Sequence, residues 1–157
     1  MVLVVVGTSS NASDLPVTDT AVGEHSRLAS MVLGTNHIHI VNGGCVQIQI
    51  DDCFNCEIFL GPVGGSAFFR DCKDCKVTVA CQQFRTRDCE NLDVSLYCST
   101  KPIIETSAGV TFKPWNGAYA GLTSHFTAAG LDPEVNTWFD IYDFNQGQEC
   151  YGQVSDQ

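Results

Sequence analysis

The stretch RDCKDCKVTV (residues 70–79) decides the fold, because DDCFNCEIF (51–59) and RDCENLDVSL (87–96) repeat its pattern. Each copy has an acid followed by cysteine, then Asn or Asp, then Ile or Val, at spacings of 19 and 17 residues. Repeats this short, with apolar residues alternating between polar corners, are typical of a solenoid whose coils stack at about 4.8 Å. We therefore expect an all-β chain in which equivalent residues lie over one another.

The segments that end at each corner align in the same register, as VQIQIDDC (46–53), GSAFFRDC (65–72) and QQFRTRDC (82–89). Side chains of a strand alternate between its two faces, so each segment has an inward and an outward set. The expected inward columns are Ile48, Ala67 and Phe84, then Ile50, Phe69 and Thr86. The expected outward columns are Gln47, Ser66 and Gln83, then Gln49, Phe68 and Arg85, then Asp51, Arg70 and Arg87.

The cysteines of the repeat have two interpretations. Two C-x2-C pairs, at 53–56 and 72–75, have a separation that fits a four-cysteine zinc site. The third copy keeps Cys89 but carries Leu92 at the second position, which a metal ligand cannot occupy and a core residue can. We therefore expect no metal site and interpret these thiols as a ladder of small apolar side chains. A second inward ladder is expected from Cys81 and Cys98.

The composition limits the partners of the chain. A formal net charge of −10 and a pI near 4.5 argue against nucleic acid and anionic membranes as general partners. Nine cysteines, an odd number in a chain of 157 residues, indicate reduced thiols and a cytosolic protein.

Two of the eight basic residues, Arg85 and Arg87, share an outward face with Gln83. One interpretation is a solvated strand, with Arg70 or Arg87 paired to an acid such as Asp51. The other is that a stiff strand presents a guanidinium to a phosphate or a carboxylate. Composition alone does not choose between them.

A family resemblance extends this interpretation. The segments 51–89, LYCSTKPIIETS (96–107) and FTAAGLDPEVNTWFDIYDF (126–144) resemble the tubulin-binding cofactor C domain family, closest to its retinal branch, typified by the retinitis pigmentosa protein two. The resemblance covers about residues 31–146. It implies a right-handed parallel β-helix followed by a short C-terminal α-helical extension.

The same resemblance implies a GTPase-activating role in which an arginine enters the nucleotide site of a partner. Carried onto this sequence, the arginine finger is Arg85, and Gln83 assists it. The partner-binding candidates lie on or beside the same face: Arg87, Glu105, Phe144, Arg70 and Phe68. Without the resemblance, the residues alone favour packing in the core for Phe144.

The implied partner is an Arf-like small GTPase of the Arl3 type in its GTP form. The chain has no GxxxxGK[ST] motif, so we expect no cofactor of its own, with GTP and Mg²⁺ carried by the partner. Tubulin is the alternative partner within the family, and a non-catalytic effector or scaffold is the alternative from another class. The expected location is cytoplasmic, and the retinal branch suggests the cilium or basal body.

We expect three regions: residues 1–30 as a capping or disordered segment, 31–112 as the β-helix, and 113–157 as an extension. The extension is expected to hold one helix within YAGLTSHFTAAG (119–130), where apolar residues recur at helical spacing before a glycine. The start MVLV lacks the acylated Met-Gly-Cys of the retinal branch, so no membrane anchor is expected. The second domain of that branch is not expected within these 157 residues.

Overall fold

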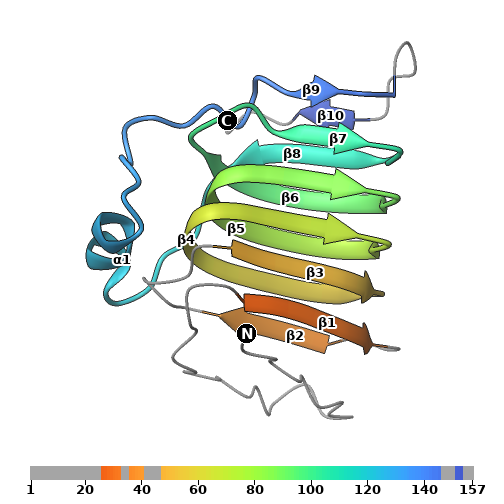
Figure 1. The fold of residues 1–157 in the computed structure, drawn as a ribbon, viewed down its shortest axis with the longest axis horizontal. Helices are drawn as coiled ribbons and strands as arrows, with labels where there is room; N and C mark the ends of the chain where they lie inside the picture. The colour runs from red at the N-terminus through yellow and green to blue at the C-terminus, as the bar shows by residue number, and fades with distance from the viewer. Residues whose placement is uncertain (1–25, 33–35, 41–46, 146–150, 154–157) are drawn as a thin grey trace.

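The strands stack in parallel along one axis, and the chain climbs this axis from β1 to β9 and β10 (Figure 1). This computed structural model describes residues 26–32, 36–40, 47–145 and 151–153. The elements in chain order are β1 (Ser26–Val32), β2 (Asn36–Ile40), β3 (Gln47–Cys53), β4 (Cys56–Arg70), β5 (Lys73–Arg87), β6 (Glu90–Cys98), β7 (Ile103–Glu105), β8 (Val110–Pro114), α1 (Leu122–Ala128), β9 (Tyr142–Asp143) and β10 (Tyr151–Gln153). All pairings between the described strands are parallel, which confirms the predicted all-β parallel solenoid.

The coil has two faces, because β4 and β5 each bend midway and contribute to both (Figure 1). Shifts in the β4–β5 register between Leu60, Val63 and Ser66 mark the bend. What we call the first face consists of β1, β3, the second halves of β4 and β5, β7 and β9. The second face consists of β2, the first halves of β4 and β5, β6, β8 and β10.

The register predicted from the repeat is confirmed on the first face. Ile48 pairs with Ala67, and Ala67 pairs with Phe84. These inward residues are buried, as are Ile50, Phe69 and Thr86 of the neighbouring column. Alternation therefore sends the intervening side chains outward, which is the step that creates an exposed column at Arg85.

Aromatic rings fill the interior along the stack. Phe69, Phe84 and Phe112 are fully buried, with centroid separations of 5.5 Å for Phe69–Phe84 and 5.8 Å for Phe84–Phe112. Removing one such ring from a close-packed core typically costs about 3–5 kcal/mol. The packed rings therefore support the strand from which the outward residues of β5 project.

The cysteines of the repeat belong to this core. The Sγ atoms of Cys72 and Cys89 donate to the backbone carbonyls of Ile50 and Phe69, at 3.7 and 3.5 Å. The neighbouring thiol of Cys53, together with burial, raises the pKa of Cys72 to about 12, so this thiol stays protonated. Leu92 is buried and pairs with Cys75, as a core position requires. Among the residues that the structure describes, no group of three or more His, Cys, Asp or Glu side chains is placed to hold a metal ion.

Polar residues with positive φ turn the corners of the coil. They are Asp52, Asn55, Asp71, Asp74, Asp88, Asn91 and Thr106, with φ between 44° and 56°. Asn and Asp tolerate this left-handed conformation better than other residues with a side chain, which explains their recurrence in the repeat. Hydrogen bonds also join neighbouring corners, such as the one from Asn91 Nδ2 to Asp74 Oδ1 at 3.0 Å.

The C-terminal extension packs against the side of the solenoid and then returns to its top (Figure 1). The predicted helix is confirmed as α1, whose buried Phe126 contacts Tyr97 at a centroid distance of 5.0 Å. Asn136 then bonds the backbone of the β6 end, accepting from Cys98 N at 3.0 Å and donating to Leu96 O at 3.2 Å. These bonds fix the path that leads into β9.

The region boundaries of the structure are less sharp than those expected from the sequence. Strand β1 begins at Ser26 and crosses the boundary expected at residue 30, and β8 crosses the one expected at 112. Residues 1–25, which hold most of the expected capping segment, lie outside the described residues. No helix in the described part of the chain has the length and apolar character to span a membrane.

Candidate functional site

The outward columns of the first face bring the predicted site residues together. The first column runs through Gln49, Phe68, Arg85, Ile103 and Tyr142. The second column runs through Asp51, Arg70, Arg87 and Glu105. Gln83 pairs with Ser66 in a third column, two residues before Arg85 on the same strand. Residues separated by up to 93 positions in the sequence therefore lie in one column of the same sheet.

Arg85 and Arg87 share a single carboxylate, that of Glu105. Arg85 Nη2 donates to Glu105 Oε1, whereas Arg87 donates from Nε at 3.0 Å and Nη2 at 2.7 Å to Oε2. The Glu105 side chain is only 15% exposed, against 36% for Arg85 and 49% for Arg87. The hydrogen bond from Arg85, followed by that from Arg87, lowers the pKa of Glu105 and keeps it ionised.

This ion-pair network carries an excess positive charge, because two guanidinium groups meet one carboxylate. Arg85 Nε is buried without a hydrogen-bond partner, so the network does not use all the donors of Arg85. The net positive charge of the network attracts an anion to the first face, where the Arg85 side chain is 36% exposed. Guanidinium groups bind phosphate and carboxylate through parallel N–H donors.

Arg70 is held differently, by a carboxylate of its own. Its Nε and Nη2 donate to Asp51 Oδ1 and Oδ2, at 2.9 and 3.0 Å, and Asp51 is 9% exposed in its side chain. The hydrogen bond that Arg70 donates to Asp51 raises the pKa of Arg70. Gln49 Nε2 donates to the same two oxygens at 3.1 and 3.0 Å. Arg70 is thus paired with Asp51, as one of the two interpretations from the sequence proposed. Its role in partner binding stays a prediction.

Phe68 lies one coil below Arg85 in the same column. The Cζ atom of Arg85 is 5.4 Å from the centroid of the Phe68 ring, and that of Arg70 is 5.9 Å from it. These distances fall within the range of cation–π contacts. The ring therefore contacts two guanidinium groups.

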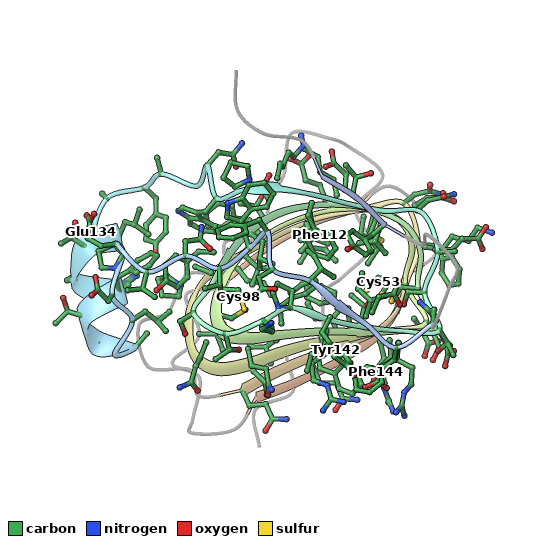
Figure 2. All side chains as sticks on the ribbon, turned by 90° about the horizontal axis from the view of Figure 1, so that it is seen from above. Cys53, Cys98, Phe112, Glu134, Tyr142 and Phe144 are labelled. Atoms are coloured by element: carbon green, nitrogen blue, oxygen red, sulfur yellow. The ribbon has the colours of Figure 1, made fainter. Side chains whose placement is uncertain are left out.

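An exposed aromatic pair lies at the end of the first column. Tyr142 and Phe144 are each 51% exposed, and their ring centroids are 4.7 Å apart. Viewed along the stack, Cys53 and Phe112 point into the coil, whereas Tyr142 and Phe144 stand on its outer side (Figure 2). Of the two interpretations of Phe144, burial is wrong, because the residue follows β9 on the outside of the top coil. Its role in partner binding stays a prediction.

Tyr142 was missed by the sequence reasoning, although it lies in the column of Arg85. It pairs with Ile103, which pairs with Arg85. Strand alternation in IYDF (141–144) places Tyr142 and Phe144 on the same side, and this signal could have found it.

Known proteins resemble the chain over most of the described residues. A model of the family described as "Tubulin binding cofactor C" matches residues 35–144. Tubulin-specific chaperone C of Bos taurus is 38% identical over 98 residues, 62% of this chain and 28% of that protein. Protein XRP2 of Danio rerio is 59% identical over 117 residues, 62% of this chain and 31% of that protein. The chain thus spans about three tenths of the length of these curated relatives.

A solved structure, that of tubulin binding cofactor C from Leishmania major, shares the fold. It superposes with a TM-score of 0.67 at 23% sequence identity, over 80% of this chain and 87% of that one. The sequence matches confirm the resemblance that the repeat motifs indicated.

Proposed function

The chain belongs to the tubulin binding cofactor C family, and on that premise we propose that it is a GTPase-activating protein for an Arf-like, Arl3-type small GTPase. Arg85 is the finger that the chain supplies in trans, and the partner carries GTP and Mg²⁺. One observation carries the proposal: Arg85 is 36% exposed on an outward column of a rigid sheet, beside an exposed aromatic pair. Gln83, on the same strand, positions the finger or the catalytic groups of the partner.

The chemistry of GTP hydrolysis explains why such an arginine accelerates it. Negative charge spreads over the transferred phosphoryl group in the transition state, and a guanidinium supplied by a second protein stabilises that charge. The gain is about 10³–10⁵ in rate, which corresponds to about 4–7 kcal/mol.

The ion pair with Glu105 is the main obstacle to this role, because Arg85 must leave it. Glu105 is only 15% exposed, so its pairing with Arg85 contributes about 1–3 kcal/mol. Arg87 keeps both of its hydrogen bonds to Oε2 when Arg85 departs, so the Glu105 carboxylate retains a counterion. Breaking the Arg85–Glu105 ion pair therefore costs less free energy than Arg85 contributes by stabilising the transition state. The Glu105 carboxylate holds Arg85 against the sheet until the triphosphate of the bound nucleotide replaces it.

The rest of the first face supplies docking energy in this proposal. Tyr142 and Phe144 present exposed rings, and aromatic residues are enriched among the side chains that dominate protein interfaces. Arg87 and Glu105 flank the finger, so both lie within the area that a GTPase would cover.

The experiment is single-turnover GTP hydrolysis by an Arl3-type GTPase, with affinity measured separately on the same proteins. Arg85→Ala should abolish the acceleration while the complex still forms. Arg85→Lys should fail as well, because an ammonium group lacks the planar fork of donors. Equal loss of affinity and rate in Arg85→Ala would favour a non-catalytic effector or scaffold, in which Arg85 only anchors the partner.

Tubulin is a second candidate partner, favoured by the similarity to tubulin-specific chaperone C. The same assay with tubulin in place of the small GTPase distinguishes the two. Acceleration of tubulin GTP hydrolysis that depends on Arg85, with none for the small GTPase, would transfer the proposal to tubulin.

A further inference from the structure

Two side chains restrain the Arg85 guanidinium in the free protein, and they do so in different ways. Glu105 accepts a hydrogen bond from its edge, whereas Phe68 contacts it through the face of the ring, with Cζ 5.4 Å from the centroid. The edge donors of a guanidinium are the groups that bind phosphate oxygens. The contact with Glu105 must therefore end when Arg85 binds phosphate, but the contact with Phe68 need not.

The Phe68 ring is itself held in place. Arg70 also contacts it, with Cζ 5.9 Å from the centroid, and Arg70 is fixed by two hydrogen bonds to the nearly buried carboxylate of Asp51. Phe68 points outward and is only half-buried, so it is not one of the aromatic residues that fill the core. Core packing does not account for an aromatic residue at this position.

From this geometry we propose that Phe68 is a positioning residue for Arg85, and the proposal rests on the function proposed above. The ring supports one face of the guanidinium and leaves its N–H edge open to the phosphate of the partner. This contact persists after Glu105 is released, and it limits the orientations that the finger samples. Phe68 therefore acts on the rate within the complex, in contrast to the role in partner binding expected from the sequence.

The test compares Phe68→Leu with Phe68→Tyr, measuring the hydrolysis rate at a saturating concentration of the chain and, separately, the affinity for the GTPase. Loss of a cation–π contact predicts that Phe68→Leu lowers the saturated rate by about 2–30-fold, with affinity unchanged. Phe68→Tyr keeps the ring and should keep the rate. Phe59→Leu is the matched control, since it removes an outward ring from the second-face half of the same strand.

Two results would overturn the proposal. One is a Phe68→Leu variant with the wild-type rate at saturation and a weaker affinity, which would make Phe68 a docking contact. The other is a Phe68→Leu variant with both the saturated rate and the affinity of wild type, which would show that the ring does not orient Arg85.

A second measurement does not depend on the GTPase. In the free ¹⁵N-labelled chain, the Nε–H resonance of Arg85 should carry a ring-current shift that Phe68→Leu removes and Phe68→Tyr retains. An unchanged resonance in Phe68→Leu would refute the positioning role. If the wild-type chain failed to accelerate hydrolysis, the proposed function would fail, and this resonance would still decide whether Phe68 positions Arg85.

Discussion

Replacing Arg87 by glutamine tests how the finger leaves its resting place. In the free protein Arg87 donates two hydrogen bonds to Glu105 Oε2, at 3.0 and 2.7 Å, while Arg85 bonds Oε1. Without Arg87, the guanidinium of Arg85 becomes the sole partner of Glu105 within this network. Moving Arg85 into the nucleotide site would then leave a carboxylate that is only 15% exposed without a counterion.

The size of the effect follows from these contacts. Hydrogen bonds to a charged group contribute about 1.5–3 kcal/mol when the group is desolvated, and exposed ion pairs contribute at most about 1 kcal/mol. Glu105 lies between these limits, so we expect a penalty of about 1–3 kcal/mol on the released state. The saturated hydrolysis rate should therefore fall by about 5–150-fold.

Single-turnover hydrolysis at saturating concentrations of the chain measures this penalty, and titration of the GTPase gives the affinity. Adding Glu105→Gln to Arg87→Gln removes the stranded charge and should restore part of the rate. Lys113→Gln is the matched control, because it removes a cation paired with Asp93 at 2.8 Å on the second face. A saturated rate for Arg87→Gln within twofold of wild type, with only affinity reduced, would refute the exchange and make Arg87 a docking residue.

Three further predictions concern the same face and its support. Because hydrogen bonds lower the pKa of Glu105, its contribution to stability is complete above the ordinary carboxyl pKa of 4.5 and is lost as the pH falls through the lowered pKa. The difference in unfolding free energy between wild type and Glu105→Gln should therefore be constant near neutral pH and shrink in acid. A difference that grows in acid would contradict the ion pair. Alanine at Tyr142 or Phe144, each half exposed, should weaken GTPase binding by about 5–30-fold without changing the saturated rate. This loss corresponds to about 1–2 kcal/mol for an aromatic interface residue. Unchanged affinity in both variants would show that the aromatic pair is not part of the interface. A Cβ atom at Gly64 would lie 2.9 Å from the carbonyl oxygen of Ala129. Gly64→Ala should therefore displace the end of α1 and lower the unfolding free energy, measured by chemical denaturation, by about 1–3 kcal/mol. A variant as stable as wild type would show that the helix moves freely.

The outward columns could be predicted because the repeat carries its own register. Alternation along β5 places Gln83, Arg85 and Arg87 on one side, and the recurring Asp–Cys corner fixes which residue of the next coil lies below each of them. The positive φ of Asp71 and its equivalents explains why the corner repeats in sequence, since few residues tolerate that conformation. Periodicity is local information, and here it was sufficient to predict which residues share each outward column.

The carboxylate that holds the finger could not be placed in the same way. Glu105 follows an irregular corner at residues 99–102, where the repeat is lost, so its register with Arg87 could not be counted along the sequence. The return of β9 onto β7 depends on long-range contacts, such as the bonds of Asn136 to the β6 end. Such docking has no periodic signal, and this is why Tyr142 was missed.

The most direct test of the finger is binding to a transition-state mimic. The affinity of the chain for the GTPase is measured with GDP alone and with GDP plus aluminium fluoride, which imitates the planar phosphoryl group. The account predicts that aluminium fluoride strengthens binding of the wild-type chain strongly and that Arg85→Ala loses most of this increment while its affinity for the GDP form is unchanged. An equal increment in the wild-type chain and in Arg85→Ala would show that Arg85 does not touch the reacting phosphate, and the central claim would be wrong.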